Sequence, residues 1–368
     1  MITNYHIYSF AKSKGMPFAI IFAMAMISLF SVSCNNSKNE IDKKHQSGVV
    51  LILNDYYYTL HLPSGEDLYL AGDSEGNITN FETDPDSIIN CVTSAFGTGF
   101  FISDDGKIAT NKHVVNRSVS DKSAVRFTRL LLNKIIQYLY DEIDSCTAIM
   151  DYCDKQYSLA TDNAEKAQYI QVYRTYKNTI DEDNEIIRDL NTIDPSDIEL
   201  EYNSNVSVAY NGSFVHSRTD FYPCTLRDTA EKDLAIIQLN SKLTPTNKHV
   251  FSVPSKNMLE HYSFGEYICK LFGSDKNDEL YMIGFNQGLN MAITGDGIYS
   301  QCTEGSINRE EKDIILYSIN AEPGSSGSPV LNRRGELVAI NFAGFKDAMG
   351  FNYGVKEQHL FELVNKNR

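Results

Sequence analysis

Short apolar segments separated by turn residues are the feature that most restricts how this 368-residue chain can fold. Residues 48–70 (GVVLILNDYYYTLHLPSGEDLYL) and 91–115 (CVTSAFGTGFFISDDGKIATNKHVV) each place two apolar runs around a turn. From residue 206 onward, similar runs return at short intervals almost to the end of the chain. Strand-length runs at this spacing favour an antiparallel sandwich or barrel over a parallel sheet with crossover helices. We therefore predict a mostly β protein.

One long segment, residues 118–194, breaks this pattern because its apolar residues recur every three or four positions, as on a helix face. The first run is Phe127, Leu131, Ile135, Leu139, Ile143, Cys146, Met150 and Cys153. The second run is Tyr169, Tyr173, Tyr176, Ile180, Ile187 and Leu190. Asp162 and Glu165 have the spacing of a capping box at the start of a helix. We predict two long antiparallel helices joined near residues 157–162.

The function of this helical hairpin stays open at the sequence level. It could dock a protein partner, cover a cleft, or associate with a second copy, and it could also be an inert decoration. Its apolar stripe, rich in tyrosine, is most simply the seam between the two helices. We favour an interaction or gating role over the inert alternative.

The N-terminal residues have the pattern of an export signal. Lys12 and Lys14 are the only Lys, Arg, Asp or Glu residues in 1–33, and the apolar run 17–29 is shorter than the roughly 20 residues that span a membrane. Cys34 follows small residues and precedes a polar stretch, so it resembles the lipidated cysteine of bacterial lipoproteins, although Ser31 stands where those signals usually have Leu. We expect an exported chain that is lipid-anchored in the cell envelope, with the membrane as a partner. Plain secretion is the alternative.

Composition restricts the other partners. A formal net charge of -15 does not suit a surface that follows nucleic-acid phosphates, so we expect no nucleic acid as a partner. The remaining six cysteines are Cys91, Cys146, Cys153, Cys224, Cys269 and Cys302. No C-x-x-C pair or histidine cluster has metal-ligand spacing, so we expect no metal and no cofactor. On one helix, Cys146 and Cys153 would be about 10.5 Å apart, too far for a disulfide, and we expect buried free thiols there.

Three polar residues in separate turn contexts could together perform nucleophilic catalysis. His113 follows the hairpin of residues 97–111, Asp233 precedes the apolar run 234–239, and Ser326 lies in the turn GSSGSP at 324–329. A serine hydroxyl becomes a nucleophile when a histidine takes its proton and a carboxylate orients that histidine. Taken singly, His113 would more simply be a surface or satisfied core histidine, Asp233 a turn residue or helix cap, and Ser326 a loop serine. Their occurrence together in the order His, Asp, Ser predicts a catalytic triad.

Three stretches around these residues resemble the chymotrypsin-fold serine endopeptidases, most of all the bacterial branch with the DegP-like proteases and the glutamyl endopeptidases. They are GTGFFISDDGKIATNKHVV at 97–115, DLAIIQL at 233–239 and GSSGSP at 324–329. The resemblance covers about residues 92–115 and 206–360 and leaves the helical segment unexplained. It implies two six-stranded antiparallel β-barrels, with the helical hairpin inserted in the first barrel.

The resemblance also implies a role for each site residue. His113 would be the general base and then the acid, Asp233 its orienting partner, and Ser326 the nucleophile. The amides of Gly324 and Ser326 would form the oxyanion hole. Ser325 stands where the digestive branch has an aspartate that pairs with a newly cut N-terminus, so we expect no activation by N-terminal trimming. The activity implied is hydrolysis of peptide bonds, with polypeptide as the substrate.

Substrate preference is less readable from the sequence. The substrate-binding positions that the resemblance implies are Asn320, Asn341, Phe342, Ala343 and Gly344. Asn320 lacks the carboxylate that trypsin-like enzymes use to bind Lys or Arg. Asn341 replaces the histidine with which glutamyl endopeptidases bind acidic side chains. We expect a small or medium neutral side chain to be preferred, and an extended substrate to add to the edge formed by residues 341–344.

The predicted organisation is a signal peptide (1–33), a tether (34–47), an N-terminal barrel with its insertion (48–243) and a C-terminal barrel with a terminal helix (244–368). A peptide-binding PDZ domain, usual in DegP-like proteins, is not expected. The alternative function is a catalytically silent lipoprotein of the same fold that acts as a binding or scaffold protein through its helical arm.

Overall fold

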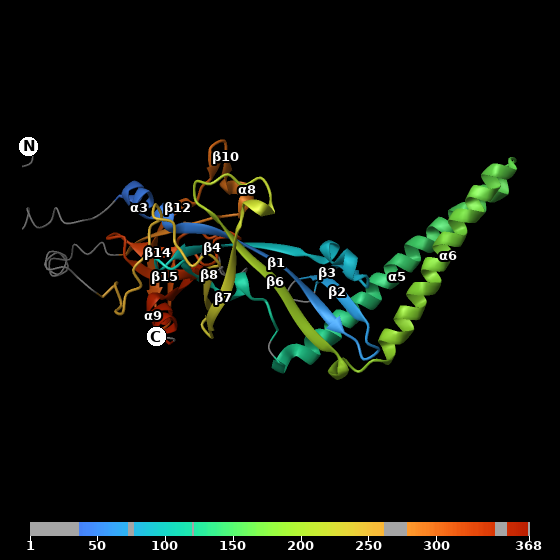
Figure 1. Ribbon diagram of the computed structural model, residues 1–368, viewed down its shortest axis with the longest axis horizontal. Helices are drawn as coiled ribbons and strands as arrows, with labels where there is room; N and C mark the ends of the chain where they lie inside the picture. Colours follow the sequence, from blue (N-terminus) through green and yellow to red (C-terminus); the bar gives the residue numbers. More distant parts are fainter. Residues whose placement is uncertain (1–36, 73–76, 120, 261–277, 343–351, 367–368) are drawn as a thin grey trace, which may run out of the picture. The chain divides into compact units, whose positions relative to one another are not determined.

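The strands of the chain close two six-stranded antiparallel β-barrels, which confirms the predicted fold class (Figure 1). The first barrel has the order β1-β4-β5-β8-β7-β6 and closes where β6 pairs with β1, and β2 and β3 extend its sheet beyond β1. The second barrel has the order β12-β13-β16-β15-β14-β9. This computed structural model describes residues 37–72, 77–119, 121–260, 278–342 and 352–366.

The first barrel and its extension consist of β1 (Val49–His61), β2 (Asp67–Gly72), β3 (Ile78–Glu82), β4 (Thr93–Phe101), β5 (Lys107–Asn111), β6 (Glu199–Tyr210), β7 (Tyr222–Ala230) and β8 (Leu234–Leu239). The second barrel consists of β9 (Glu279–Gly284), β12 (Gln301–Glu310), β13 (Ile314–Tyr317), β14 (Pro329–Asn332), β15 (Leu337–Phe342) and β16 (Asn352–Lys356). A short hairpin is formed by β10 (Ile293–Thr294) and β11 (Gly297–Ile298).

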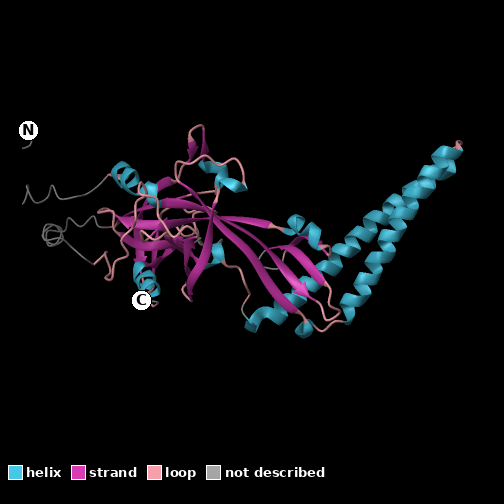
Figure 2. Cartoon of the chain, in the orientation of Figure 1, coloured by secondary structure: helices cyan, strands magenta, loops and turns pink. Residues whose placement is uncertain are grey.

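Helices are fewer than strands in the described chain, and two of them are long (Figure 2). The α-helices are α3 (Lys38–His45), α4 (Lys112–Val115), α5 (Asp121–Leu159), α6 (Asn163–Thr192), α8 (Leu289–Ala292) and α9 (Glu357–Asn365). The 3₁₀ helices are η1 (Gln46–Gly48), η2 (Pro85–Cys91), η3 (Pro195–Asp197) and η4 (Arg218–Asp220). No described helix is both long and apolar enough to cross a membrane.

Packing divides the chain into two compact units. One unit comprises the described residues of Met1–Asn54, Phe96–Val115 and Val206–Arg368, and it holds the interiors of both barrels. The other comprises Asp55–Ala95 and Asn116–Asn205, and it holds β2, β3, α5 and α6.

Both predicted hairpin turns are present, and each depends on a glycine with positive φ. In the turn between β1 and β2, Gly65 has φ 90° and the amide of Leu62 donates to the carbonyl of Glu66. In the turn between β4 and β5, Gly106 has φ 82°. Residues with a Cβ rarely adopt this conformation, so glycine sets the register of the flanking strands.

The apolar residues of the first unit form interiors for each barrel and a layer that both barrels share. Val50, Phe101 and Ile237 are among the buried residues of the first barrel, and Met282 and Val338 are among those of the second. The shared layer includes Phe100 of β4, Ile283 of β9, Ile340 of β15 and Leu360 of α9. Because one apolar layer joins the barrels, loops at their junction are held against both.

The segment predicted as a tether contains helix α3, which packs onto the barrels. Ile41 is fully buried in the shared apolar layer, and His45 is 2% exposed. The His45 and His249 rings meet edge to face with centroids 4.7 Å apart, and burial lowers the pKa of both. Cys34, the predicted lipidation site, lies outside the described residues.

The inserted segment forms the two predicted antiparallel helices, α5 and α6, linked by residues 160–162. At their base, Phe127 and Leu131 of α5 and Ile187 of α6 pack with Leu60 of β1 and other apolar residues of β1 and β2. Asp162 caps α6 by accepting a hydrogen bond from the amide of Ala164 at 3.3 Å. Cys146 and Cys153 are buried free thiols, as predicted.

A buried carboxylate in the hairpin seam is expected to make the hairpin less stable at neutral pH. Asp183 of α6 is 7% exposed, and burial together with Glu142 and Glu182 raises its pKa to about 6. Because the folded-state pKa lies above the ordinary value of 3.8, stability falls as pH rises from about 4 to 6 and stays reduced above that. Asp183→Asn should therefore add about 1–3 kcal/mol to the unfolding free energy of the hairpin at pH 8.

Thermal unfolding followed by helical circular dichroism tests this prediction at pH 8 and pH 4. The gain should shrink at pH 4, where wild-type Asp183 is itself mostly protonated. Equal gains at the two pH values would contradict the assignment.

Candidate active site

His113 is held by two hydrogen bonds to one carboxylate. It lies in α4, directly after β5, where its Nδ1 is 2.6 Å from Oδ2 of Asp233. The backbone amide of His113 donates to the other oxygen, Oδ1, at 2.9 Å. A carboxylate accepts only, so Nδ1 carries the proton in the neutral ring, and Nε2 is left with a lone pair. His113 is therefore oriented as a proton acceptor at Nε2.

Asp233 reaches His113 from an unusual backbone conformation. Its φ is 59°, in the left-handed region that residues other than glycine seldom adopt. Its carbonyl accepts from the amide of Lys112 at 3.0 Å and from Nδ2 of Asn111 at 3.1 Å. These bonds from the end of β5 hold the strained conformation in place, as is common at functional sites.

Ser326 lies in a loop that is fixed on both sides. Its carbonyl accepts from the amide of Thr98 in β4 at 2.8 Å. The next amide, of Gly327, donates to the carbonyl of Asn341 in β15 at 2.9 Å. Gly327 has φ 87°, and a Cβ there would come within 2.1 Å of the carbonyl oxygen of Thr98. The first barrel therefore contacts this loop through β4, and the second contacts it through β15.

The three serines of this loop differ in what their hydroxyls bond. Ser325 Oγ donates to the carbonyl of Glu322 at 2.7 Å and accepts from Nδ2 of Asn341 at 3.1 Å. Ser328 Oγ donates to the carbonyl of Ser325 at 2.6 Å. Ser326 Oγ forms no hydrogen bond to any described residue, and the residue is 6% exposed. Of the three hydroxyls, only that of Ser326 is left available for chemistry.

The backbone of the same loop offers two unused donors. The amides of Ser325 and Gly327 are bonded, to Glu322 and Asn341, whereas those of Gly324 and Ser326 donate to no acceptor in the described part of the chain. Gly324 has φ 94°, and a Cβ there would lie 2.5 Å from the carbonyl oxygen of Phe285. Only glycine fits this position without displacing the loop. Free amides at Gly324 and Ser326 are the arrangement that an oxyanion hole requires.

Thr98 holds this loop, a role that the sequence analysis missed. Its buried hydroxyl donates to the carbonyl of Gly324 at 2.8 Å and accepts from the amide of Phe285 at 3.0 Å. Its carbonyl accepts from the hydroxyl of Thr110 at 2.7 Å. The sequence signal was its place inside the GTGFF stretch, but a threonine in a strand is ordinary, and the two partners of its hydroxyl lie more than 180 residues away.

Thr98→Val is expected to lower turnover more than it lowers stability. Valine keeps the shape of threonine but breaks the bridge between Gly324 and Phe285, so the free amides of the loop lose their orientation. We expect a loss of about 10–100-fold in kcat against about 1–2 kcal/mol in unfolding free energy. Steady-state kinetics and thermal unfolding measure both. Thr110→Val, which leaves the bond from Thr98 to Gly324 intact, is the matched control and should keep most of the turnover.

Aromatic contacts connect His113 to the second barrel. The His113 ring meets Phe342 of β15 edge to face with centroids 5.4 Å apart, and Phe342 stacks on Tyr353 at 4.9 Å. Burial and the nearby Asp233 raise the pKa of Tyr353. No hydrogen bond joins Nε2 of His113 to Oγ of Ser326 among the described residues. Such bonds often tighten only when substrate is bound.

The predicted substrate-binding residues occupy different environments. Asn320 is exposed and donates from Nδ2 to Glu322 at 3.2 Å. Asn341 is fully buried, where Nδ2 donates to Ser325 and Oδ1 accepts from the hydroxyl of Tyr317 at 2.6 Å. Its side chain therefore braces the loop from within. Ala343 and Gly344 lie outside the described residues.

Comparison with known proteins adds two findings. Residues 201–340 match the family model described as a trypsin-like peptidase domain. The match contains Asp233 and Ser326, whereas His113 lies before it, on the other side of the helical insertion. The chain is also similar to the crystal structure of the serine endoprotease from Yersinia pestis, with 14% sequence identity and a TM-score of 0.41. That similarity covers 90% of this chain and 66% of the other, just under two thirds of its length.

Proposed function

Because the chain carries a trypsin-like peptidase domain with the chymotrypsin fold, we propose that it is a serine endopeptidase that acts through His113, Asp233 and Ser326. The observation that carries this proposal is the pair of hydrogen bonds, 2.6 and 2.9 Å long, between Asp233 and His113. These bonds leave Nε2 as the proton acceptor, which is the state that a general base needs.

The proposed reaction uses these groups in turn. Oγ of Ser326 attacks the carbonyl carbon of the peptide bond while Nε2 of His113 takes the hydroxyl proton. The same nitrogen then gives that proton to the leaving amine, and the C–N bond breaks to leave an acyl-enzyme. Water, deprotonated by His113, hydrolyses this ester and restores the serine. Asp233 holds the ring and stabilises its cationic form throughout.

The negative charge that develops on the substrate oxygen would be stabilised by the free amides of Gly324 and Ser326. Removing one such donor typically costs about 100–1,000-fold in turnover. The bonds from Thr98 to the carbonyls of Gly324 and Ser326 support this role, because they fix the loop before substrate arrives.

For the substrate, we propose polypeptides with a neutral side chain before the cleaved bond. Exposed Asn320 and buried Asn341 provide no carboxylate for Lys or Arg and no cation for Asp or Glu. Cleavage of a peptide library, read by mass spectrometry, tests this preference. Predominant cleavage after charged residues would contradict it.

A fluorophosphonate probe tests the proposed nucleophile. We expect one adduct per chain and expect fragmentation of the labelled peptide to place it on Ser326, because the hydroxyls of Ser325 and Ser328 are bonded within the loop. An adduct on either neighbour would overturn the assignment. A folded chain that takes no label and cleaves no peptide would instead support the alternative, a silent relative that acts as a scaffold.

We further propose that the chain is exported and anchored to the cell envelope by a lipid on Cys34. The basis is the signal-like pattern of residues 1–33. Metabolic labelling with a fatty acid analogue tests it. Label should appear on the wild type and be lost in Cys34→Ser, and an unlabelled wild type would contradict the anchor.

A further inference from the structure

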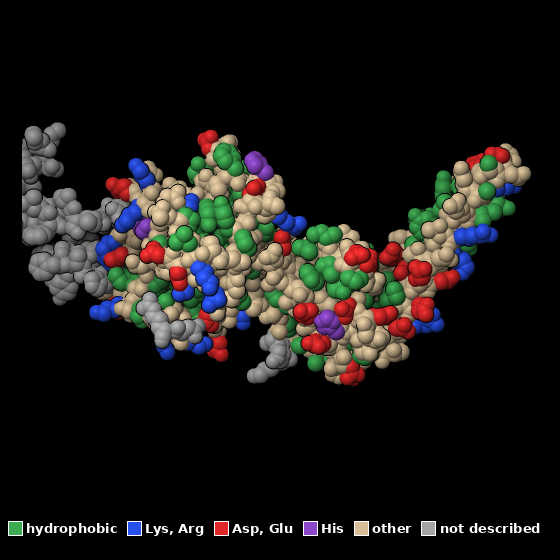
Figure 3. Space-filling view, in the orientation of Figure 1, with side chains coloured by type: hydrophobic (Ala, Val, Ile, Leu, Met, Phe, Trp, Pro, Cys, Tyr) green, Lys and Arg blue, Asp and Glu red, His purple; other side chains and the backbone are tan. Residues whose placement is uncertain are grey.

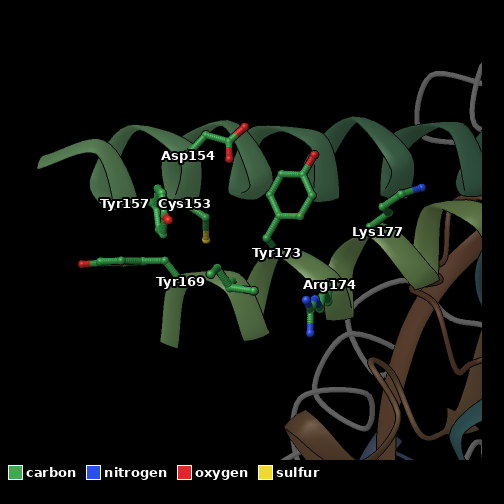
Figure 4. A pocket seen from close by; sticks show the side chains of 8 residues that line it. Cys153, Asp154, Tyr157, Tyr169, Tyr173, Arg174 and Lys177 are labelled. Carbon is green, nitrogen blue, oxygen red and sulfur yellow. The ribbon is translucent and has the colours of Figure 1, made fainter. Parts of the chain in front are cut away.

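The distal part of the α5/α6 hairpin contains a pocket of about 420 Å³ between the two helices. Figure 4 shows Tyr157 and Tyr173 extending between the helices and Asp154 on the helix opposite Arg174. The pocket is lined by Cys153, Asp154 and Tyr157 of α5 and by Tyr169, Ile170, Tyr173, Arg174 and Lys177 of α6. It is the part of the hairpin seam that the two helices do not fill.

The seam is closed at its base and open near its tip. At the base, Leu131 and Ile135 of α5 are at most 1% exposed, because the sheet of β1 and β2 covers them. Near the tip, Tyr157 is 40% exposed and Ile170 is 39% exposed. Two helices alone cannot enclose such side chains, whereas a four-helix bundle can.

Charges beside the pocket are segregated between the two helices. On α5, Asp144, Asp151 and Asp154 are exposed and spaced by seven and three residues, so they share one helix face. We call them the acidic stripe. On α6, Arg174 and Lys177 are exposed and follow Ile170 at spacings of four and three. We call Arg174 and Lys177 the basic stripe. Figure 3 shows charged side chains of both signs along the hairpin.

Little in the described part of the chain neutralises these stripes. Asp151, Asp154 and Arg174 form no ion pair with any described residue. Lys177 pairs with Asp181 one turn along α6 at 3.0 Å, but both side chains are more than half exposed. A pair of this kind contributes about 0.5 kcal/mol or less, so Lys177 can readily exchange partners.

We propose that the pocket and its two stripes form a self-association surface whose occupant is the hairpin of a second copy of this chain. A twofold axis parallel to the helices would place α5 of each copy on α6 of the other, with the two tips side by side. Asp154 and Arg174 line the same pocket, so the acidic and basic stripes border one surface of the hairpin. The acidic stripe of each copy then faces the basic stripe of the other.

In this arrangement both stripes of each copy face a stripe of the other copy. The dimer is therefore closed. Each copy presents one acidic and one basic stripe. The same surface patch on two copies is therefore complementary to itself, as an isologous dimer requires. The tyrosines of the two pockets and Ile170 would form the shared core. An antiparallel arrangement would instead bring the acidic stripes together, which charge repulsion opposes.

The size of the contact predicts a dimer that depends on concentration. Two helices about 20 Å wide together, in contact over about 30 Å, would bury about 600 Å² per partner. The total of about 1,200 Å² is at the lower limit for specific interfaces. The dimer should therefore dissociate on dilution.

Sedimentation velocity of the intact chain over a range of concentrations tests the proposal, with two charge-reversed variants. Asp151→Lys with Asp154→Lys reverses two of the three charges of the acidic stripe, and Arg174→Glu with Lys177→Glu reverses both charges of the basic one. Each variant alone should dimerise at least about 10-fold more weakly, because like charges then face each other. An equimolar mixture should recover dimers, since the two variants complement each other.

Glu182→Lys is the matched control, because it reverses an exposed charge about 140° around α6 from Lys177. It should leave the dimer unchanged, and circular dichroism should show the same helix content in all variants. A wild type that stays monomeric at every concentration would overturn the proposal. So would a mixture that fails to recover dimers, or a loss of dimers in the control variant.

Discussion

Replacing Ser326 with alanine is expected to abolish peptide hydrolysis while leaving the fold intact. In the proposed triad the nucleophile, its base and the orienting carboxylate act as a unit, so loss of the hydroxyl should lower kcat by about 10⁶-fold. The stability cost should be below about 0.5 kcal/mol, because Oγ of Ser326 bonds no described residue. Turnover of a peptide substrate and thermal unfolding of the same preparation measure the two effects.

Ser325→Ala provides the control for the loop itself. It removes bonds to Glu322 and Asn341, so it should lower stability yet retain the nucleophile. If Ser326→Ala kept more than a hundredth of the wild-type kcat, another group would be attacking the substrate. The role assigned to Ser326 would then be wrong.

Asp233→Asn is expected to have the second largest effect, a loss of about 10⁴-fold in kcat. Asparagine has nearly the same shape, but its amide can turn an N–H group toward Nδ1 of His113. The ring then holds its proton on Nε2 and can no longer accept one from Ser326. Binding should change little, so KM should stay near the wild-type value while kcat falls.

The rates of peptide hydrolysis by Ser326→Ala and Asp233→Asn across pH, together with the rate of fluorophosphonate labelling, test this prediction. Labelling of Asp233→Asn should be slowed along with hydrolysis, because the probe needs the same activated hydroxyl. Asp105→Asn, at an exposed turn of the same barrel, is the control and should behave like the wild type. Turnover of Asp233→Asn within tenfold of wild type would contradict the orienting role.

The features that could be predicted from the sequence are those encoded by neighbouring residues. The spacing of Phe127, Leu131 and Ile135 is sufficient to indicate a helix face, and Gly65 and Gly106 mark turns that only glycine readily forms. His113 and Ser326 each stand in a short motif, so the chemistry proposed for them could be inferred from the sequence.

The features that could not be predicted depend on contacts between distant parts of the chain. Nothing near Thr98 in the sequence indicates that its hydroxyl bridges Gly324 and Phe285. Asn341 was predicted to bind substrate because of its place in the strand that an extended peptide would join. Its burial against Ser325 and Tyr317 instead follows from how the second barrel closes. Helix α3 has few apolar residues, so Ile41 alone gave little sign that this segment packs onto the barrels.

The clamp formed by Thr98 has a consequence for how the protein would lose activity. Ser326 belongs to the second barrel, yet the hydroxyl and amide that hold its loop belong to β4 of the first. Mild denaturant that loosens the apolar layer between the barrels would release the loop while each barrel kept its own hydrogen-bonded ring. The proposed peptidase activity would therefore depend on the packing of the two barrels against each other. It would be lost at a lower denaturant concentration than the β-strand signal in circular dichroism.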